Sequence, residues 1–209
     1  MLAFRPLCVL SALLMVPCGD DTPERAADSG VVEGRIVVDG GGRLPTVVVY
    51  LESTDPGREY AAPSERPKIR QKGAKFAPSL LVICVGQTVD FPNDEDRPIQ
   101  HNVFSKSVAH SFDLGLYRPG KSKSVKFDEP GAVRLHCSIH KHMDGVIYVC
   151  PTPFFARVAD DGRFRIESVP DGEYELRTWQ QKRRYLDRSV RVKVAAERPT
   201  KVKLELRRN

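Results

Sequence analysis

The stretch from Val133 to Cys150, VRLHCSIHKHMDGVIYVC, decides the fold. Its first residues alternate apolar and polar, which predicts a strand that turns Cys137 inward and His136 outward. The run Gly145–Cys150 is rich in β-branched and aromatic residues and predicts a second strand. The segment Cys137–Met143 is therefore expected to be the loop that joins two strands of one sheet.

The rest of the chain also has sequence patterns that are typical of short strands. Apolar runs such as Thr46–Leu51, Leu80–Val85 and Thr88–Phe91 are separated by turn residues, and the chain holds 16 Pro and 15 Gly. No stretch has sustained helical periodicity. The sequence predicts an all-β protein, and its 209 residues allow one large or two small domains.

The loop Cys137–Met143 holds a thiol, two imidazoles and a thioether. Soft sulfur ligands with imidazole suit copper, and two His with one Cys and a weak axial Met form the electron-transfer copper arrangement. One more His is needed, and His101 qualifies because it follows a strand and a Pro-containing loop. The predicted ligands of a single type 1 copper are thus His101, Cys137, His140 and Met143, with His142 as a rival ligand.

Four segments resemble the plastocyanin/amicyanin branch of the cupredoxins, as in plastocyanin-like methylamine utilisation proteins. They are FAPSLLVICVGQTVDFPN (76–93), HNV (101–103) and PGAVRLHCSIH (130–140), followed by MDGVIYV (143–149). The resemblance covers residues 68–150, and the two-residue gap between His140 and Met143 is similar to amicyanin. It implies a Greek-key β-sandwich in which Cys137 is the thiolate ligand and Met143 the axial one.

The resemblance also implies contacts around the ligands. Asn102 would tie the loop of His101 to the loop of Cys137, through Ser138. The strand with Cys84 would run parallel to the strand with Cys150. These two cysteines then either form a disulfide or remain two buried thiols, and the sequence leaves both readings open.

The segments on either side of the copper domain resemble carboxypeptidase regulatory-like, or transthyretin-like, β modules. The resemblance rests on GRIV and PTVVVYL within 31–53, and on DGRF and VPDGEYEL within 156–209. We expect one small β-sandwich that is split by an inserted cupredoxin domain. The alternative is that residues 31–53 belong to the cupredoxin sheet.

The first residues have the layout of a secretory signal. Arg5 precedes the uncharged apolar run Leu7–Val16, which is shorter than the roughly 20 residues of a membrane span. Residues 1–19 are predicted to be a signal peptide and 20–30 a flexible leader, which places the protein in the periplasm or cell envelope. The alternative is a lipidated Cys18, and membrane association is expected only in that case.

These observations favour an exported one-electron carrier that is not an enzyme and that exchanges electrons with a redox protein partner. The sequence has no Ser-His-Asp arrangement, no clear motif of paired catalytic carboxylates and no phosphate-binding loop. The net charge is +6, but the expected export argues against nucleic acid as a partner. The alternatives are a copper-delivery protein without a redox partner and an envelope structural protein with a vestigial copper site.

Overall fold

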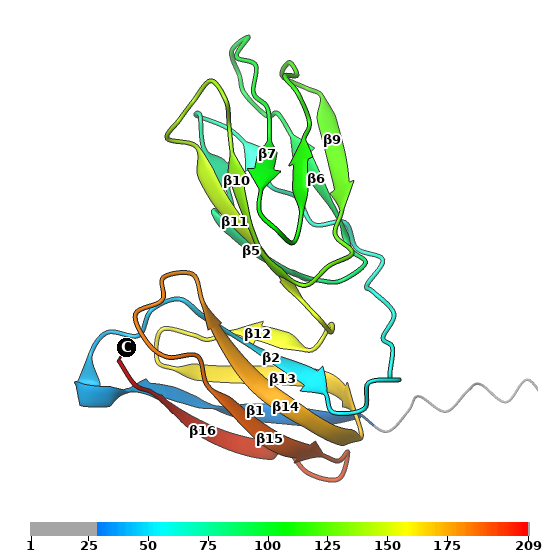
Figure 1. Ribbon diagram of the computed structural model, residues 1–209, viewed down its shortest axis with the longest axis vertical. Coiled ribbons are helices and arrows are strands. Elements are labelled where there is room, and N and C mark those ends of the chain that lie inside the picture. Colours follow the sequence, from blue (N-terminus) through cyan, green and yellow to red (C-terminus); the bar gives the residue numbers. More distant parts are fainter. Residues whose placement is uncertain (1–28, 209) are drawn as a thin grey trace, which may run out of the picture.

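The computed structural model describes residues 29–208, and these residues form an almost entirely β structure of two stacked modules (Figure 1). The all-β prediction is confirmed. The predicted signal peptide, Cys18 and most of the predicted leader lie outside the described residues. In the described part a single 3-10 turn is present, at Asp39–Gly41, and no helix there is long and apolar enough to cross a membrane.

The flanking module is built from strands at both ends of the described chain. Its two sheets have the strand orders β13-β1-β16 and β12-β2-β14-β15. The strands are β1 (Ser29–Val38), β2 (Val47–Ser53), β12 (Phe155–Arg157), β13 (Arg163–Pro170), β14 (Gly172–Gln180), β15 (Ser189–Val194) and β16 (Thr200–Leu206). Strand β1 runs antiparallel to β13 and parallel to β16, so early and late segments of the chain share one core.

Buried apolar residues recur along these strands and together form the core of the flanking module. Val47, Val49 and Leu51 of β2 are fully buried and belong to one apolar cluster with Tyr174 and Leu176 of the neighbouring strand β14. Strand β1 begins at Ser29, slightly before the predicted start of the module, because Ser29 and Gly30 already pair with β13.

The middle module contains the strands between these two halves. Its main sheet has the order β5-β11-β10-β7-β8, and the pairs β3-β4 and β6-β9 complete the module. The strands are β3 (Arg70–Gln71), β4 (Phe76–Ala77), β5 (Leu80–Cys84), β6 (Thr88–Pro92), β7 (Phe104–Lys106), β8 (Ser111–Asp113), β9 (Ser122–Lys126), β10 (Gly131–His136) and β11 (Asp144–Cys150). The predicted strand pair around the Cys137 loop is β10 and β11, which pair antiparallel from end to end.

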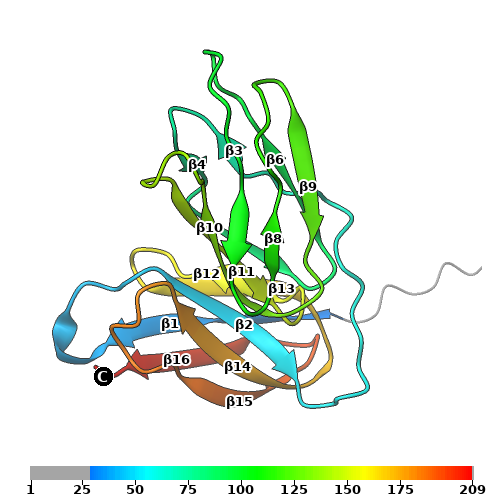
Figure 2. The ribbon, with the colours of Figure 1, turned by 45° about the horizontal axis from the view of Figure 1, so that its top comes forward.

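The two modules meet at the sheet β12-β2-β14-β15 (Figure 2). Tyr148 of β11 stacks on Trp179 of β14 with ring centroids 4.2 Å apart and ring planes 14° from parallel. Val48, Cys84 and Cys150 are buried in the same small cluster. Apolar contacts therefore hold the modules together, and the loop between β10 and β11 lies at the far end of the middle module (Figure 1).

Candidate metal centre

The candidate site lies in two loops at this far end. His101 lies between β6 and β7, and Cys137 directly follows β10. The backbone N–H of Met143 donates to the carbonyl of His140 at 2.9 Å, which closes the short turn before β11. The pairing of His136 with Phe104 brings the end of β10 beside β7, and so carries Cys137 toward the loop of His101.

Three donor atoms converge there. The Nδ1 atoms of His101 and His140 lie 3.1 Å apart, and the Sγ atom of Cys137 lies 3.9 Å and 3.8 Å from them. Within residues 29–208 this trio is the group of His, Cys and acidic side chains whose ligand atoms could share one metal ion. His101 is fully buried and Cys137 is 3% exposed, so two of the three donors are shielded from water.

The spacing of these atoms fits a metal ion. Metal–nitrogen bonds are about 2.0–2.1 Å and metal–sulfur bonds about 2.3 Å, so one ion can touch atoms up to roughly 4.2 Å apart for two nitrogens and 4.4 Å for nitrogen and sulfur. All three measured separations fall within these limits. Two imidazoles and one thiolate are also the donor set that suits copper.

Glu95 fixes the orientation of the His101 ring. Its Oε1 atom lies 2.8 Å from Nε2 of His101, and its side chain is only 6% exposed. Burial raises the pKa of Glu95, but hydrogen bonds from the Ala74 backbone, the His101 ring and the Gly73 backbone lower it below its ordinary value overall. An ionised carboxylate only accepts, so Nε2 carries the proton and Nδ1 keeps its lone pair for a metal.

A second set of hydrogen bonds joins the two loops. The Oδ1 atom of Asn102 accepts from the backbone N–H of Ser138 at 2.7 Å and from its hydroxyl at 2.9 Å. The Asn102 amide donates to Asp113 at 3.1 Å, and Asp113 also accepts from the Gly115 N–H at 2.8 Å. The contact expected between Asn102 and Ser138 is thus present, and it is anchored in β8.

The remaining residues of the motif differ in burial. Met143 is 1% exposed and belongs to the same apolar cluster as Cys137, next to the convergent donors in the chain. His142 is exposed, and its ring centroid lies 6.0 Å from that of His140, outside the donor trio. His136 is half-buried and packs on Phe104.

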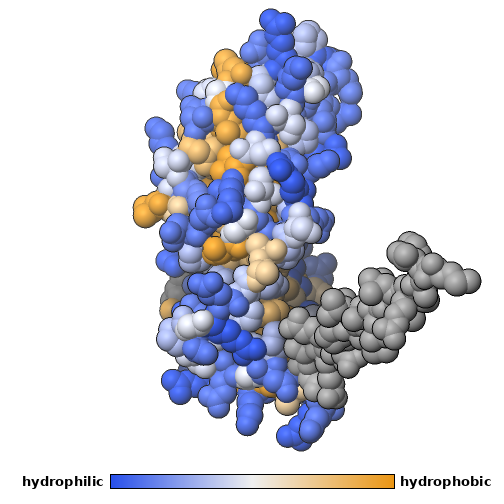
Figure 3. Space-filling model, turned by 90° about the vertical axis from the view of Figure 1, so that its right-hand side faces the viewer, coloured by the Kyte–Doolittle hydropathy of each residue, from blue (hydrophilic) through white to orange (hydrophobic). Residues whose placement is uncertain are grey.

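The surface over the site is partly apolar. His140 is half-buried, and the neighbouring Ile139 is 52% exposed. Burial lowers the pKa of His140, and the neighbouring His101 and His142 lower it further. Apolar surface gathers in the upper part of one face of the molecule, over the middle module, whereas the flanking module is mostly hydrophilic there (Figure 3).

Glu95 and Asp113 are site residues that the sequence analysis missed. Glu95 lies within an acidic run, Asp94 to Asp96, six residues before His101. Only the fold shows which of these three carboxylates turns inward, because the other two pair with Arg70 and Lys72 at the surface. The one usable signal was the general rule that a ligating His has a carboxylate or carbonyl partner.

Cys84 and Cys150 lie side by side, in register, on the parallel strands β5 and β11. The structure holds them as free, buried thiols rather than as the disulfide that the sequence also allowed. Burial raises the pKa of Cys84, and burial together with the neighbouring Cys84 raises that of Cys150. The Sγ atom of Cys84 lies 3.5 Å from Oε1 of Gln87, which gives the thiol a hydrogen-bond partner.

Solved structures similar to this chain include copper proteins. A purple cupredoxin from Nitrosopumilus maritimus is 25% identical over 40% of this chain and 99% of its own, with a TM-score of 0.36. An amicyanin variant in its reduced form is 21% identical over 49% of this chain and 98% of its own, with a TM-score of 0.38. A copper-containing nitrite reductase from Thermus scotoductus is 26% identical over 47% of this chain, with a TM-score of 0.40, and the chain spans a quarter of that protein's length. No protein-family model matches the chain, and the comparison with curated proteins gave no match.

Proposed function

We propose that this protein is an exported one-electron carrier that holds a single type 1 copper. The observation that supports this most directly is the convergence of His101 Nδ1, His140 Nδ1 and Cys137 Sγ within 4.8 Å of one another. Copper, when bound, supplies a change between two oxidation states that accepts and returns one electron.

The residues of the chain would hold the copper and fix the orientation of its ligands. Cys137, His101 and His140 would hold the ion, and Met143 would offer a thioether as a further, weaker ligand. Glu95 keeps the His101 ring in one tautomer, and the Asn102–Ser138 hydrogen bonds keep the two ligand loops at a fixed separation. A framework that barely moves between oxidation states favours fast electron exchange.

The half-buried ring of His140 is the proposed port for electrons. It is the ligand nearest to solvent in the trio, and the exposed side chain of Ile139 lies beside it. A redox protein partner would dock on this apolar surface. The fully buried His101 and the nearly buried Cys137 exclude water and small substrates, which supports a carrier rather than an enzyme.

Absorption and EPR spectra of the copper-loaded protein test this function. We expect an intense thiolate-to-copper band in the visible region that Cys137→Ser abolishes and Met143→Leu retains with a changed reduction potential. A protein that binds one copper, keeps Cys137 and lacks this band would overturn the proposal. Tight copper binding with the band present, but without electron exchange with a soluble redox protein, would instead support copper delivery.

A further inference from the structure

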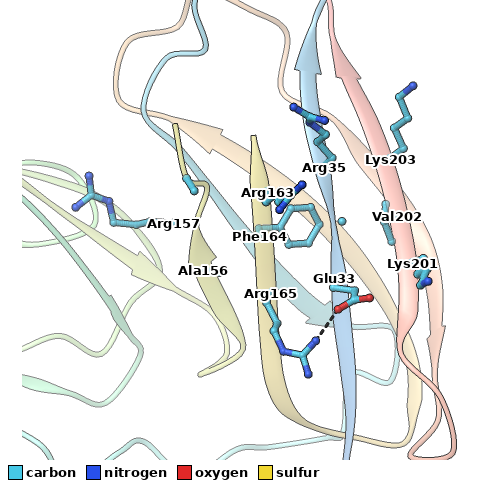
Figure 4. Close-up of a pocket in the computed structure, with 12 residues that line it drawn as sticks. Glu33, Arg35, Ala156, Arg157, Arg163, Phe164, Arg165, Lys201, Val202 and Lys203 are labelled. Carbon is cyan, nitrogen blue, oxygen red and sulfur yellow. Dashed lines mark hydrogen bonds and ion pairs between the residues drawn. The ribbon is translucent and has the colours of Figure 1, made fainter. Parts of the chain in front are cut away.

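Two hollows in the flanking module gather basic side chains. The larger, of about 850 Å³, lies over the outward face of the sheet β13-β1-β16 (Figure 4). Two of its arginines, Arg163 and Arg165, have carboxylate partners. Arg165 pairs with Glu33 at 2.5 Å, and Arg163 pairs with Asp161 at 3.3 Å. Figure 4 shows the side chains of Arg165 and Glu33 pointing toward one another. This larger hollow therefore has a mixed lining, in which Glu33 and the paired arginines lie beside Arg157, Lys201 and Lys203, which have no ion-pair partner among residues 29–208.

The second hollow, which we name the basic pocket, lies at one end of the flanking module. It has a volume of about 370 Å³. Its lining comes from the loop after β1 and the loop after β14, and consists of Arg43, Leu44, Pro45, Thr46, Gln181, Lys182 and Arg184. Three of these seven side chains are cationic and none is acidic.

The two loops are held against each other by the buried Tyr185. Its hydroxyl lies 3.4 Å from the position that a Cβ atom would take at Gly42, in the opposite loop. Its carbonyl accepts from the side-chain amide of Gln180 at 3.1 Å, and Tyr185 bridges to Arg208 at the end of the described chain. The basic pocket thus has a fixed frame, and the C-terminal end of the chain lies near the loop after β1 (Figure 1).

The basic pocket gathers positive charge among the described residues. Among residues 29–208, Arg43, Lys182 and Arg184 have no ion-pair partner. Asp187, the carboxylate of the same loop as Lys182, lies 3.9 Å from Arg183 instead. Like charges gathered without a partner repel one another, so the arrangement is most stable when an anion lies between them.

The donors suit a phosphate group. An arginine fork matches two oxygens of one phosphate, and a lysine adds a point charge. Thr46, with its hydroxyl, and Gln181, with its amide, also line the basic pocket and offer further donors. Three cations also match a group that carries more than one negative charge better than they match a single carboxylate. We propose that the basic pocket binds the phosphate group of an anionic ligand.

The phosphate could come from a free anion or from a phospholipid headgroup, and two arms of one experiment distinguish them. The full chain, treated with a chelator so that no metal competes, is titrated with pyrophosphate in a calorimeter. In parallel it is sedimented with phosphatidylcholine vesicles, with and without phosphatidic acid. Binding in the calorimeter assigns a free anion, and binding only to the acidic vesicles assigns a headgroup.

Variants link the binding to the basic pocket. Arg43→Gln and Arg184→Gln are each expected to weaken binding about tenfold, since each removes a charge-assisted hydrogen bond. The control Lys201→Gln with Lys203→Gln removes two cations from the larger hollow and should leave the affinity unchanged. The absence of binding in both arms, an equal loss in the control, or binding of citrate as tight as that of pyrophosphate would each overturn the proposal.

Discussion

The Nε2 atom of His101 lies 2.8 Å from the Oε1 atom of Glu95, and both side chains are buried. This pair links the proposed copper ligand to the short strands at the start of the middle module, because Glu95 also accepts from the backbone N–H of Ala74 at 2.8 Å. The orientation of one ligand thus depends on a segment about 25 residues earlier in the chain. The site is built by the fold as a whole rather than by the Cys137 loop alone.

Replacement of Glu95 by Gln should weaken copper binding by 10- to 100-fold, the usual range for a lost partner of a ligating His. Gln offers a neutral amide in place of the carboxylate, so the His101 ring loses its strong acceptor. Competition with a chromogenic copper chelator measures the affinity. Asp96→Asn is the matched control, because Asp96 is exposed and pairs with the surface residue Lys72 at 3.1 Å. Equal affinities for the two variants would show that Glu95 does not orient the ligand.

Asn102→Ala should destabilise the folded chain by about 1–3 kcal/mol, since two donors of Ser138 lose their acceptor in a partly buried loop. Ser138→Ala should cost less, because the backbone N–H of residue 138 still donates to Asn102. Urea unfolding curves measure both changes. A larger loss for Ser138→Ala than for Asn102→Ala would contradict the assigned hydrogen bonds.

The strands and the ligand loop could be predicted because their signals are local. A period of two turns Val133, Leu135 and Cys137 to one face whatever the rest of the chain does, and all three are buried. The spacing within Cys137–Met143 likewise limits which side chains can meet at one point. The all-β class follows from such patterns, whereas the inclusion of His101 rested on the need for a second imidazole and on the resemblance to cupredoxins.

Long-range features could not be predicted in the same way. The parallel pairing of β1 with β16 joins residues 32 and 200, and nothing in either segment specifies the other. The choice of Glu95 over its acidic neighbours depends on how the loop before His101 turns. The state of Cys84 and Cys150 depends on geometry and oxidation, which the residue types alone leave open.

The thiols of Cys84 and Cys150 should resist alkylation in the folded protein. Burial raises the pKa of both, so the reactive thiolate is scarce near neutral pH and the sulfur atoms are also shielded. Mass spectrometry of peptides after treatment with iodoacetamide locates the label. We expect label at both positions only after denaturation. A peptide pair joined through Cys84 and Cys150 would show that the two form a disulfide in the protein as isolated.

Trp179→Ala should separate the unfolding of the two modules. Trp179 is half-buried and stacks on Tyr148 across their contact, so its removal should destabilise the chain by about 3 kcal/mol, at the low end for a Trp truncation. Scanning calorimetry should then resolve two transitions where the parent chain gives one. Trp179→Phe keeps an aromatic ring on Tyr148 and should retain the single transition.

Leu186→Ala, at a side chain that is 51% exposed, is the control and should change stability by less than about 0.5 kcal/mol. If Trp179→Ala unfolds in the same single transition as the control, the stack does not couple the modules, and the chain crossings between β2 and β3 and between β11 and β12 must do so instead.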